Sequence, residues 1–150
     1  MDLFSAMDVG SSGLKAQRLR LNLTAQNLAN ANTTETPEGG PYEAKRAVFA
    51  TQGAGSTPGS FEAAFQGAWN GGPRPEGVEV REVVESQQPP RQVYDPAHPD
   101  ADEDGYVAKP AVDTVTEMTD LMSATRAYKA NTQTISAARE MAMHALRIGQ

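Results

Sequence analysis

The chain has 150 residues, a formal net charge of −6 and no cysteine, which excludes disulfide bonds and thiolate zinc sites. Its acidic balance argues against nucleic acid or an anionic membrane as a main partner, because both attract basic patches. No stretch reads as a transmembrane span, and the N-terminus lacks the basic and then apolar segments of a cleaved export signal.

The first element expected is an N-terminal axial helix within residues 1–32. Gly10 and Gly13 weaken helix formation, so the prediction is strongest from Leu14 to Asn30. Two apolar stripes run along this segment on nearly opposite sides. The first comprises Met7, Leu14, Leu21 and Leu28, extended by Leu3 and Ala25, and the second comprises Val9, Ala16, Leu19 and Leu23.

Two apolar faces on one helix indicate that both sides become buried. We expect one face to pack inside the chain and the other to meet neighbouring subunits. The alternative is a monomeric bundle in which the middle of the chain covers the second face. The charges favour association through the ends, because residues 1–30 and 112–150 are almost neutral whereas residues 31–111 carry six basic and thirteen acidic groups.

Asparagine and threonine crowd the end of this helix, from Asn27 to Thr34. Such side chains compete for backbone hydrogen bonds and favour helix ends and turns. A frayed helix end explains the composition but not the repeated asparagines. Hydrogen bonds from Asn27 and Asn30 to another helix or to a folded-back loop would explain the repetition.

Residues 33–111 are predicted to form a β-rich middle with short strands at 42–49, 78–84 and 92–94. Three such strands make a small antiparallel sheet that needs support from the helices. The Gly- and Pro-rich segment at about 51–76 is predicted to be flexible. Its aromatic residues Phe61, Phe65 and Trp69 lie four apart, so they form either a docking helical turn or a loop tucked onto the sheet.

An aspartate-rich stretch provides the only candidates for a metal site, which are Asp100, Asp102 and Asp104. They match the opening of a calcium loop, but Ala111 stands where that loop needs a bidentate glutamate. A turn in which aspartates accept hydrogen bonds from backbone amides is therefore favoured. The two histidines, His98 and His144, have no neighbours in a catalytic order, so we expect no enzyme activity and no cofactor.

A C-terminal axial helix is predicted within residues 112–150, from Val112 to Ile148, with Asp113 or Thr114 as its N-cap and Glu117 completing a capping box. About 35 residues would span roughly 50 Å, and a helix of that length needs a partner. Its main seven-residue line comprises Leu121, Tyr128 and Ile135, followed by Ala142 and Leu146, and a second, shorter line comprises Val115, Met118 and Met122.

The elements together predict a mainly α chain with a small β-rich insertion. Its long terminal helices pack as a coiled-coil-like pair, and short antiparallel strands lie between them in sequence.

Several motifs resemble those of one family. The stretch Ser12-Gly13-Leu14-Lys15-Ala16-Gln17-Arg18 and the later Asn27-Leu28-Ala29-Asn30-Ala31-Asn32-Thr33 are similar to the signature of the rod and hook axial proteins of the bacterial flagellum. The motifs around Pro37–Tyr42, Tyr94–Asp102 and Gly105–Val107 narrow the resemblance to the proximal rod. Glu117-Met118 and Arg126-Ala127-Tyr128-Lys129-Ala130-Asn131 resemble the C-terminal helix of that family.

The resemblance implies a structural subunit that polymerises through its terminal helices into the hollow drive shaft carrying torque from the motor to the hook. It implies export by the flagellar type III system without a cleaved signal, and a place in the periplasmic rod of the basal body. The implied partners are copies of the chain, rod proteins of the FlgB, FlgF and FlgG types, and the ring-to-rod adaptor of the FliE type.

On this interpretation the first stripe of the N-terminal helix meets the C-terminal helix within a subunit, and the second stripe faces neighbours. The residues expected at the assembly interface are Val9, Leu14, Ala16, Leu19, Leu21, Leu23, Asn27, Leu28, Asn30, Leu121, Tyr128, Ile135 and Leu146. Other interpretations are another rod subunit of the same machine, a free-standing calcium-binding or adaptor module, and a cell-wall hydrolase that would use Glu82 and Glu85.

Overall fold

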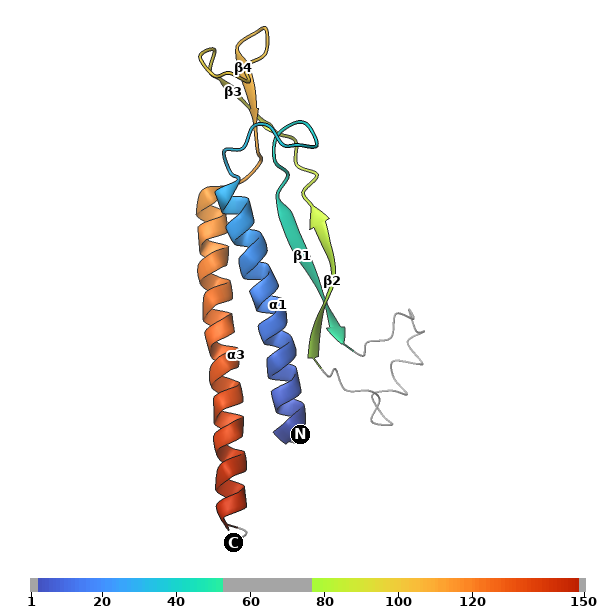
Figure 1. Cartoon of the computed structure of the whole chain (residues 1–150), viewed down its shortest axis with the longest axis vertical. Coiled ribbons are helices and arrows are strands. Elements are labelled where there is room, and N and C mark those ends of the chain that lie inside the picture. Colours follow the sequence, from blue (N-terminus) through green and yellow to red (C-terminus); the bar gives the residue numbers. More distant parts are fainter. Residues whose placement is uncertain (1–2, 53–76, 149–150) are drawn as a thin grey trace, which may run out of the picture. The chain divides into compact units, whose positions relative to one another are not determined.

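The computed structural model describes residues 3–52 and 77–148 (Figure 1). Two long helices stand at the ends of the chain, and the described residues between them include four strands, which confirms the predicted fold class. The segment predicted to be flexible lies outside the described residues apart from its first two positions, and so do Phe61, Phe65 and Trp69. In chain order the elements are α1 (Leu3–Ala29), β1 (Lys45–Gln52), β2 (Gly77–Glu85), β3 (Arg91–Tyr94), β4 (Tyr106–Lys109) and α3 (Thr114–Ile148).

The chain divides into two compact units, and each unit contains part of both long helices. The first unit comprises Met1–Gln17, Phe49–Arg81 and Ala127–Gln150. The second unit comprises Arg18–Val48 and Glu82–Arg126.

Helix α1 begins at Leu3, within the range 1–32 given by the prediction but before Leu14, where the prediction becomes strongest. Gly10 and Gly13 lie in this early part and form a close contact with α3. A Cβ atom at Gly10 would lie 2.9 Å from Ile135 Cγ1, and one at Gly13 would lie 2.8 Å from Asn131 Nδ2. Both distances are too short for a larger residue without a shift of the neighbour. The glycines therefore lower helix propensity but let the two helix backbones approach each other in the first unit.

Helix α3 runs over 35 residues, as predicted, and Asp113 caps its start. Asp113 Oδ1 accepts a hydrogen bond from Val115 N at 3.0 Å, and Oδ2 accepts one from the Thr116 hydroxyl at 3.0 Å. The expected capping box does not form, because the Glu117 carboxylate bonds to α1 instead. An aspartate at the N-cap is sufficient to satisfy the free amide groups of the first turn.

The strands form two separate two-stranded sheets rather than the single sheet expected. Strands β1 and β2 pair with each other, and we call this sheet the β1–β2 ribbon. Strands β3 and β4 form an antiparallel hairpin in which Arg91 lies opposite Lys109 and Tyr94 opposite Tyr106. Strand β4 was not predicted. It follows the turn at Gly105, whose φ of +82° suits only glycine without strain.

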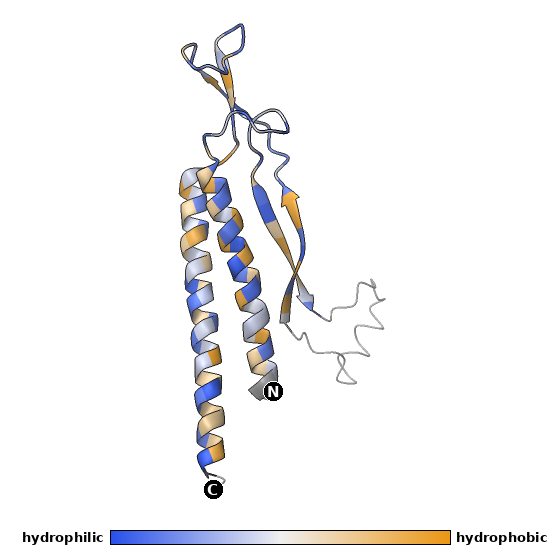
Figure 2. Cartoon of the chain, viewed as in Figure 1, coloured by the Kyte–Doolittle hydropathy of each residue, from blue (hydrophilic) through white to orange (hydrophobic). Residues whose placement is uncertain are grey.

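Strand β1 starts at Lys45, three residues later than predicted, because Tyr42 belongs to the loop that closes the end of α1. The amide of Tyr42 donates to Thr33 O at 3.1 Å, and its ring packs against the small buried cluster of Ala31, Ala44 and Val112. Apolar residues occur on both helices and on the strands (Figure 2). Within the described residues, no helix is both long and apolar enough to cross a membrane.

Candidate assembly surface

In the first unit, Ser12 ties α1 to the start of β2. Its hydroxyl donates to Val9 O at 2.8 Å, within α1, and accepts a hydrogen bond from Val78 N at 3.1 Å. The side of α1 that carries Gly10 and Gly13 meets α3 at the same level. This part of α1 therefore contacts both the second helix and the β1–β2 ribbon.

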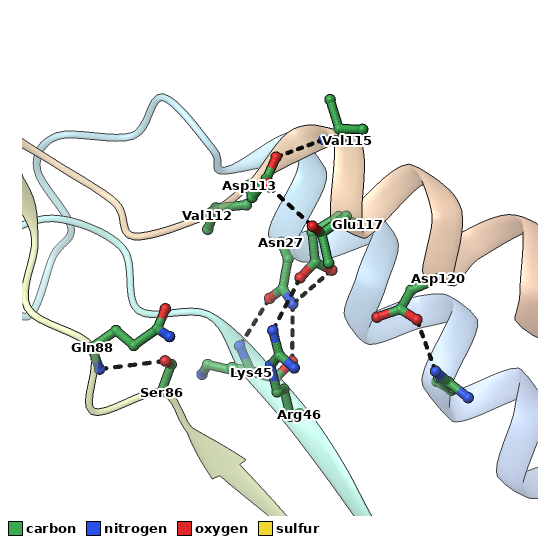
Figure 3. Close-up of polar contacts among 12 residues, drawn as sticks. Asn27, Lys45, Arg46, Ser86, Gln88, Val112, Asp113, Val115, Glu117 and Asp120 are labelled. Atoms are coloured by element: carbon green, nitrogen blue, oxygen red, sulfur yellow. Dashed lines mark hydrogen bonds and ion pairs between the residues drawn. The ribbon is translucent and has the colours of Figure 1, made fainter.

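In the second unit, the buried side chain of Asn27 joins α1 to β1 and α3 (Figure 3). Asn27 is only 2% exposed. Its Oδ1 accepts hydrogen bonds from Lys45 N at 2.8 Å and from the Tyr42 hydroxyl at 3.0 Å. Its Nδ2 donates to Lys45 O at 3.0 Å and to Glu117 Oε2 at 3.2 Å. The amide thus pairs with the first residue of β1 as a neighbouring strand would, and all of its polar atoms are satisfied.

The carboxylate of Glu117 is the charged member of this network and is 4% exposed. Apart from Asn27, it has the guanidinium of Arg46 at 3.9 Å, and Arg46 itself is exposed. Burial is the main cause that raises the pKa of the Tyr42 hydroxyl. The positive charge of Lys45 opposes this shift, and the negative charges of Glu117 and Glu85 add to it. The Tyr42 hydroxyl therefore keeps its proton at neutral pH and remains a donor to Asn27.

One ion pair links the two helices between these points. Arg20 Nη2 lies 3.0 Å from Asp120 Oδ1 in the second unit, and both side chains are about one-third exposed. Within each unit, a later residue of α1 faces an earlier residue of α3, so the helices run antiparallel. The α1 residues for which a contact with α3 is described include the small residues Gly10 and Gly13 and the polar residues Arg20 and Asn27.

The structure corrects the expected assignment of the two α1 stripes. Ala16 and Leu23 were expected to face neighbouring subunits, but they are 3% and 8% exposed in the single chain. Asn27 is also covered, because its hydrogen bonds stay within the chain. The physical reason is that the β1–β2 ribbon contacts α1 on the side that was predicted to be free.

The remaining predicted interface residues have mixed exposure. Asn30 is engaged locally, donating to Gln26 O at 2.9 Å and accepting from the Thr33 hydroxyl. Ile135 meets α1 at Gly10. The exposed members are Val9, Tyr128 and Leu146, and the half-buried members are Leu14, Leu19, Leu21, Leu28, Asn30, Leu121 and Ile135.

An exposed apolar stripe lies on α3 and comprises Val115, Met118 and Met122, which we call the outer stripe. These side chains are 71%, 51% and 55% exposed. They lie at spacings of three and four residues and so share one face. The buried residues Glu117 and Ala124 lie on the opposite face. The sequence shows this line as a second, shorter apolar face of the helix, and it was not among the predicted interface residues.

The aspartate-rich turn is held by its own hydrogen bonds. Asp102 Oδ1 accepts from Asp104 N at 3.0 Å and from Tyr106 N at 2.7 Å, and Asp100 Oδ2 accepts from the Thr34 hydroxyl at 2.6 Å. In the described part of the chain, no group of three histidine, aspartate or glutamate side chains is placed to hold a metal ion. The contacts agree with the favoured alternative of a turn bonded to backbone amides.

Comparison with known proteins gives two family matches, one at each end of the chain. Residues 7–35 match the family described as "Flagella basal body rod protein", and residues 103–148 match "Flagellar basal body rod FlgEFG protein C-terminal". The chain is 41% identical to the flagellar basal-body rod protein FlgC of Escherichia coli O157:H7 over the full length of both. The chain belongs to the FlgC family.

Relatives from distant bacteria support this assignment to the FlgC family. The FlgC protein of Borreliella burgdorferi is 40% identical over all of this chain and 99% of its own length. The Bacillus subtilis FlgC protein is 38% identical over the full length of both chains. The family consists of structural rod proteins of the flagellar basal body, so the chain is not an enzyme.

Proposed function

We propose that this chain is a structural subunit of the proximal rod, which polymerises through its terminal helices into the hollow shaft that carries torque from the motor to the hook. The main support is the full-length similarity to FlgC proteins from several bacteria. A second support is the antiparallel helix pair that leaves the outer stripe of α3 free for a neighbour.

The geometry suits a load-bearing subunit for a physical reason. Torque acts on the contacts between subunits, and apolar contacts along long helices spread the load over a large buried area. Inside the chain, α1 is joined to α3 and to the ribbon by close backbone contact and by buried hydrogen bonds, which resist sliding.

The proposed partners are further copies of this chain, rod proteins of the FlgB, FlgF and FlgG types, and the ring-to-rod adaptor of the FliE type. The proposed location is the periplasmic part of the basal body. Export by the flagellar type III system, without a cleaved signal, would deliver the chain there.

Imaging of isolated basal bodies tests the proposal directly. Basal bodies from cells that carry a tagged copy of the chain should show the tag in the rod, and cells lacking the chain should be non-motile and without a complete rod. Motile cells with intact basal bodies in the absence of the chain would contradict the proposal.

The substitution Met118→Asp tests the role of the outer stripe. A carboxylate at a position that becomes buried between subunits is costly by several kcal/mol, whereas at an exposed position of a free chain it changes the free energy of unfolding very little. We therefore expect a folded chain and a loss of motility. Ser123→Asp is the matched control, because Ser123 is exposed on the same helix outside the stripe, and cells with this variant should swim normally.

A further inference from the structure

The β3–β4 hairpin carries an aromatic pair on its outer face (Figure 1). Tyr94 lies opposite Tyr106 in the antiparallel register, and their rings meet edge to face with centroids 5.3 Å apart. Side chains on a strand alternate between its two faces, and the neighbouring position Val107 is fully buried. The two tyrosines therefore lie on the face that the chain leaves uncovered, where they are 64% and 45% exposed.

The turn that follows the aromatic pair is held by backbone hydrogen bonds. Asp95 N donates to Gly105 O at 3.0 Å, and Asp102 N donates to Tyr106 O at 2.8 Å. A Cβ atom at Gly105 would lie 3.0 Å from Tyr94 Cε2, so the ring of Tyr94 packs directly against this glycine. The aromatic face is thus already formed, and little conformational freedom is lost when a partner covers it.

The same end of the hairpin is strongly acidic. Five of the 19 acidic groups of the chain, and none of its 13 lysines and arginines, lie from Gln92 to Ala108. Glu103 and Asp104 are exposed, and no ion pair joins either of them to another described residue. Tyrosine rings and carboxylates both attract a positive charge, so this surface suits cationic side chains. We call Tyr94, Glu103, Asp104 and Tyr106 the acidic tip.

The other end of the hairpin is basic. Arg91 lies opposite Lys109, and like charges in such a pair repel each other. Arg91 Nη2 donates to Val112 O at 2.7 Å, which is a neutral acceptor, and no ion pair joins either cation to another described residue. Asp113, which follows, has both of its oxygens bound within the first turn of α3. Arg91 and Lys109, which we call the basic foot, therefore lack an ion-pair partner in the described chain.

The two ends of the hairpin cannot neutralise each other within one chain. Three positions separate the Arg91–Lys109 pair from the Tyr94–Tyr106 pair, which corresponds to about 10 Å of strand. The side chains also point to opposite faces, because the separation is an odd number of positions. Only a head-to-tail contact between copies brings the unlike ends together, and contacts of this kind generate rings or open helical filaments.

We propose that the acidic tip docks on the basic foot of a second copy of the chain. This inference rests on the proposed function and names one contact between copies. The rings of Tyr94 and Tyr106 pack on the stems of the two cations, and Glu103 and Asp104 supply the negative charge. Tip and foot both lie in the second unit and outside the two long helices.

Charge reversal of either end tests the contact in cells that lack the native chain. The tip variant is Glu103→Lys/Asp104→Lys, and the foot variant is Arg91→Gln/Lys109→Glu. Each should lower the number of complete rods per cell by about tenfold, because like charges then meet between copies. A foot variant that builds rods normally would overturn the proposal, since the tip would then bind another protein or nothing.

Two controls separate the contact from a general effect of charge or folding. Glu35→Lys/Glu43→Lys makes the same change of charge at exposed positions outside the hairpin and should leave rod number unchanged. Arg91→Gln alone removes the hydrogen bond to Val112 O without reversing the charge of Lys109, and its effect should be much smaller than that of the foot variant. Controls as damaging as the reversed chains would overturn the proposal.

A mixture of the two reversed chains shows whether the contact lies between copies. In cells that make both variants, the positive tip of one chain meets the negative foot of the other, and the native ends pair in the same way. Rod number should recover to about half of the native value, although neither variant supports it alone. A mixture no better than its components would overturn the proposal.

Carbodiimide cross-linking of isolated basal bodies needs no variant. The reagent condenses a carboxylate and a lysine amine in contact into an amide, and takes up the water lost as its urea. Trypsin leaves Gln92–Arg126 as one peptide, because Pro110 follows Lys109, and Lys109 is the only lysine in it. Two copies of this peptide joined from Lys109 to Glu103 or Asp104 can come only from two chains, and we expect this product.

The outcome of the cross-linking separates this inference from the proposed function. Basal bodies that contain the chain but yield no such joined peptide, or that yield Lys109 joined to a different protein, would refute the docking alone. A chain absent from basal bodies would refute the proposed function.

Discussion

Near Gly10, α1 is held by close contact between small residues, whereas near Asn27 it is held by a buried network of hydrogen bonds. In the first unit, the missing side chains of Gly10 and Gly13 bring the backbone of α1 onto Ile135 and Asn131. In the second unit, a single amide binds Tyr42, Lys45 and Glu117 at once.

The close contact at Gly10 and the network around Asn27 should respond differently to substitution. A steric contact fails when a residue becomes larger, and the neighbour can often relax. A buried polar network fails when one member is removed, because the others lose their partners in a place that water does not reach. We therefore expect the network to be the more sensitive of the two regions.

The largest effect is expected from Asn27→Ala. The substitution leaves the Glu117 carboxylate and both backbone groups of Lys45 without this partner, and it should lower the free energy of unfolding by about 3 kcal/mol. Urea denaturation of the purified chain measures the change. The control is Asn22→Ala, at an exposed position of the same helix. Equal effects of the two substitutions would show that the network does not hold α1.

A smaller effect is expected from Gly10→Val, which places a branched side chain against Ile135. Overpacking of this kind typically lowers the free energy of unfolding by about 2 kcal/mol. Combining it with Ile135→Ala should recover part of the loss, and a double-mutant cycle in urea measures the coupling. Ser11→Val, on the exposed side of the same turn, should change stability much less. A coupling of zero would mean that α1 and α3 do not meet at Gly10.

The smallest effect concerns pH. Hydrogen bonds from the Thr116 hydroxyl and from Val115 N lower the pKa of Asp113 below its ordinary value of 3.8. A lowered folded-state pKa contributes stability above the unfolded pKa, and this contribution is lost as pH falls through the folded pKa. The difference in unfolding free energy between the natural chain and Asp113→Asn should therefore be constant near neutral pH and shrink below about pH 4. A difference independent of pH down to pH 2 would contradict the cap.

The sequence predicted α3 closely because all of its signals are local. The absence of proline, the N-cap at Asp113 and the seven-residue line through Tyr128 depend on neighbours along the chain. The early part of α1 was predicted less firmly for the converse reason. Gly10 and Gly13 lower the local propensity for helix, and only the distant residues Asn131 and Ile135 show why glycine stands there.

The candidate surface was predicted only in part. The sequence shows that α1 has two apolar faces, but the choice between a neighbour and the middle of the chain depends on where the ribbon packs. On the ribbon side, that contact is made by the backbone amides of Val78 and Lys45, and a backbone amide cannot be recognised from the type of residue that carries it. The outer stripe could be seen in the sequence, yet its exposure depends on which side of α3 meets α1.

The two helices differ in length, and an apolar side chain of the longer helix stays exposed near its end. Helix α1 has 27 residues and α3 has 35, and Leu146, which lies on the same side of α3 as Ile135, is 74% exposed beyond the contact at Gly10. Eight residues correspond to about 12 Å. If the chain assembles as proposed, Leu146 on this overhang is a position where a neighbouring subunit would add apolar contact.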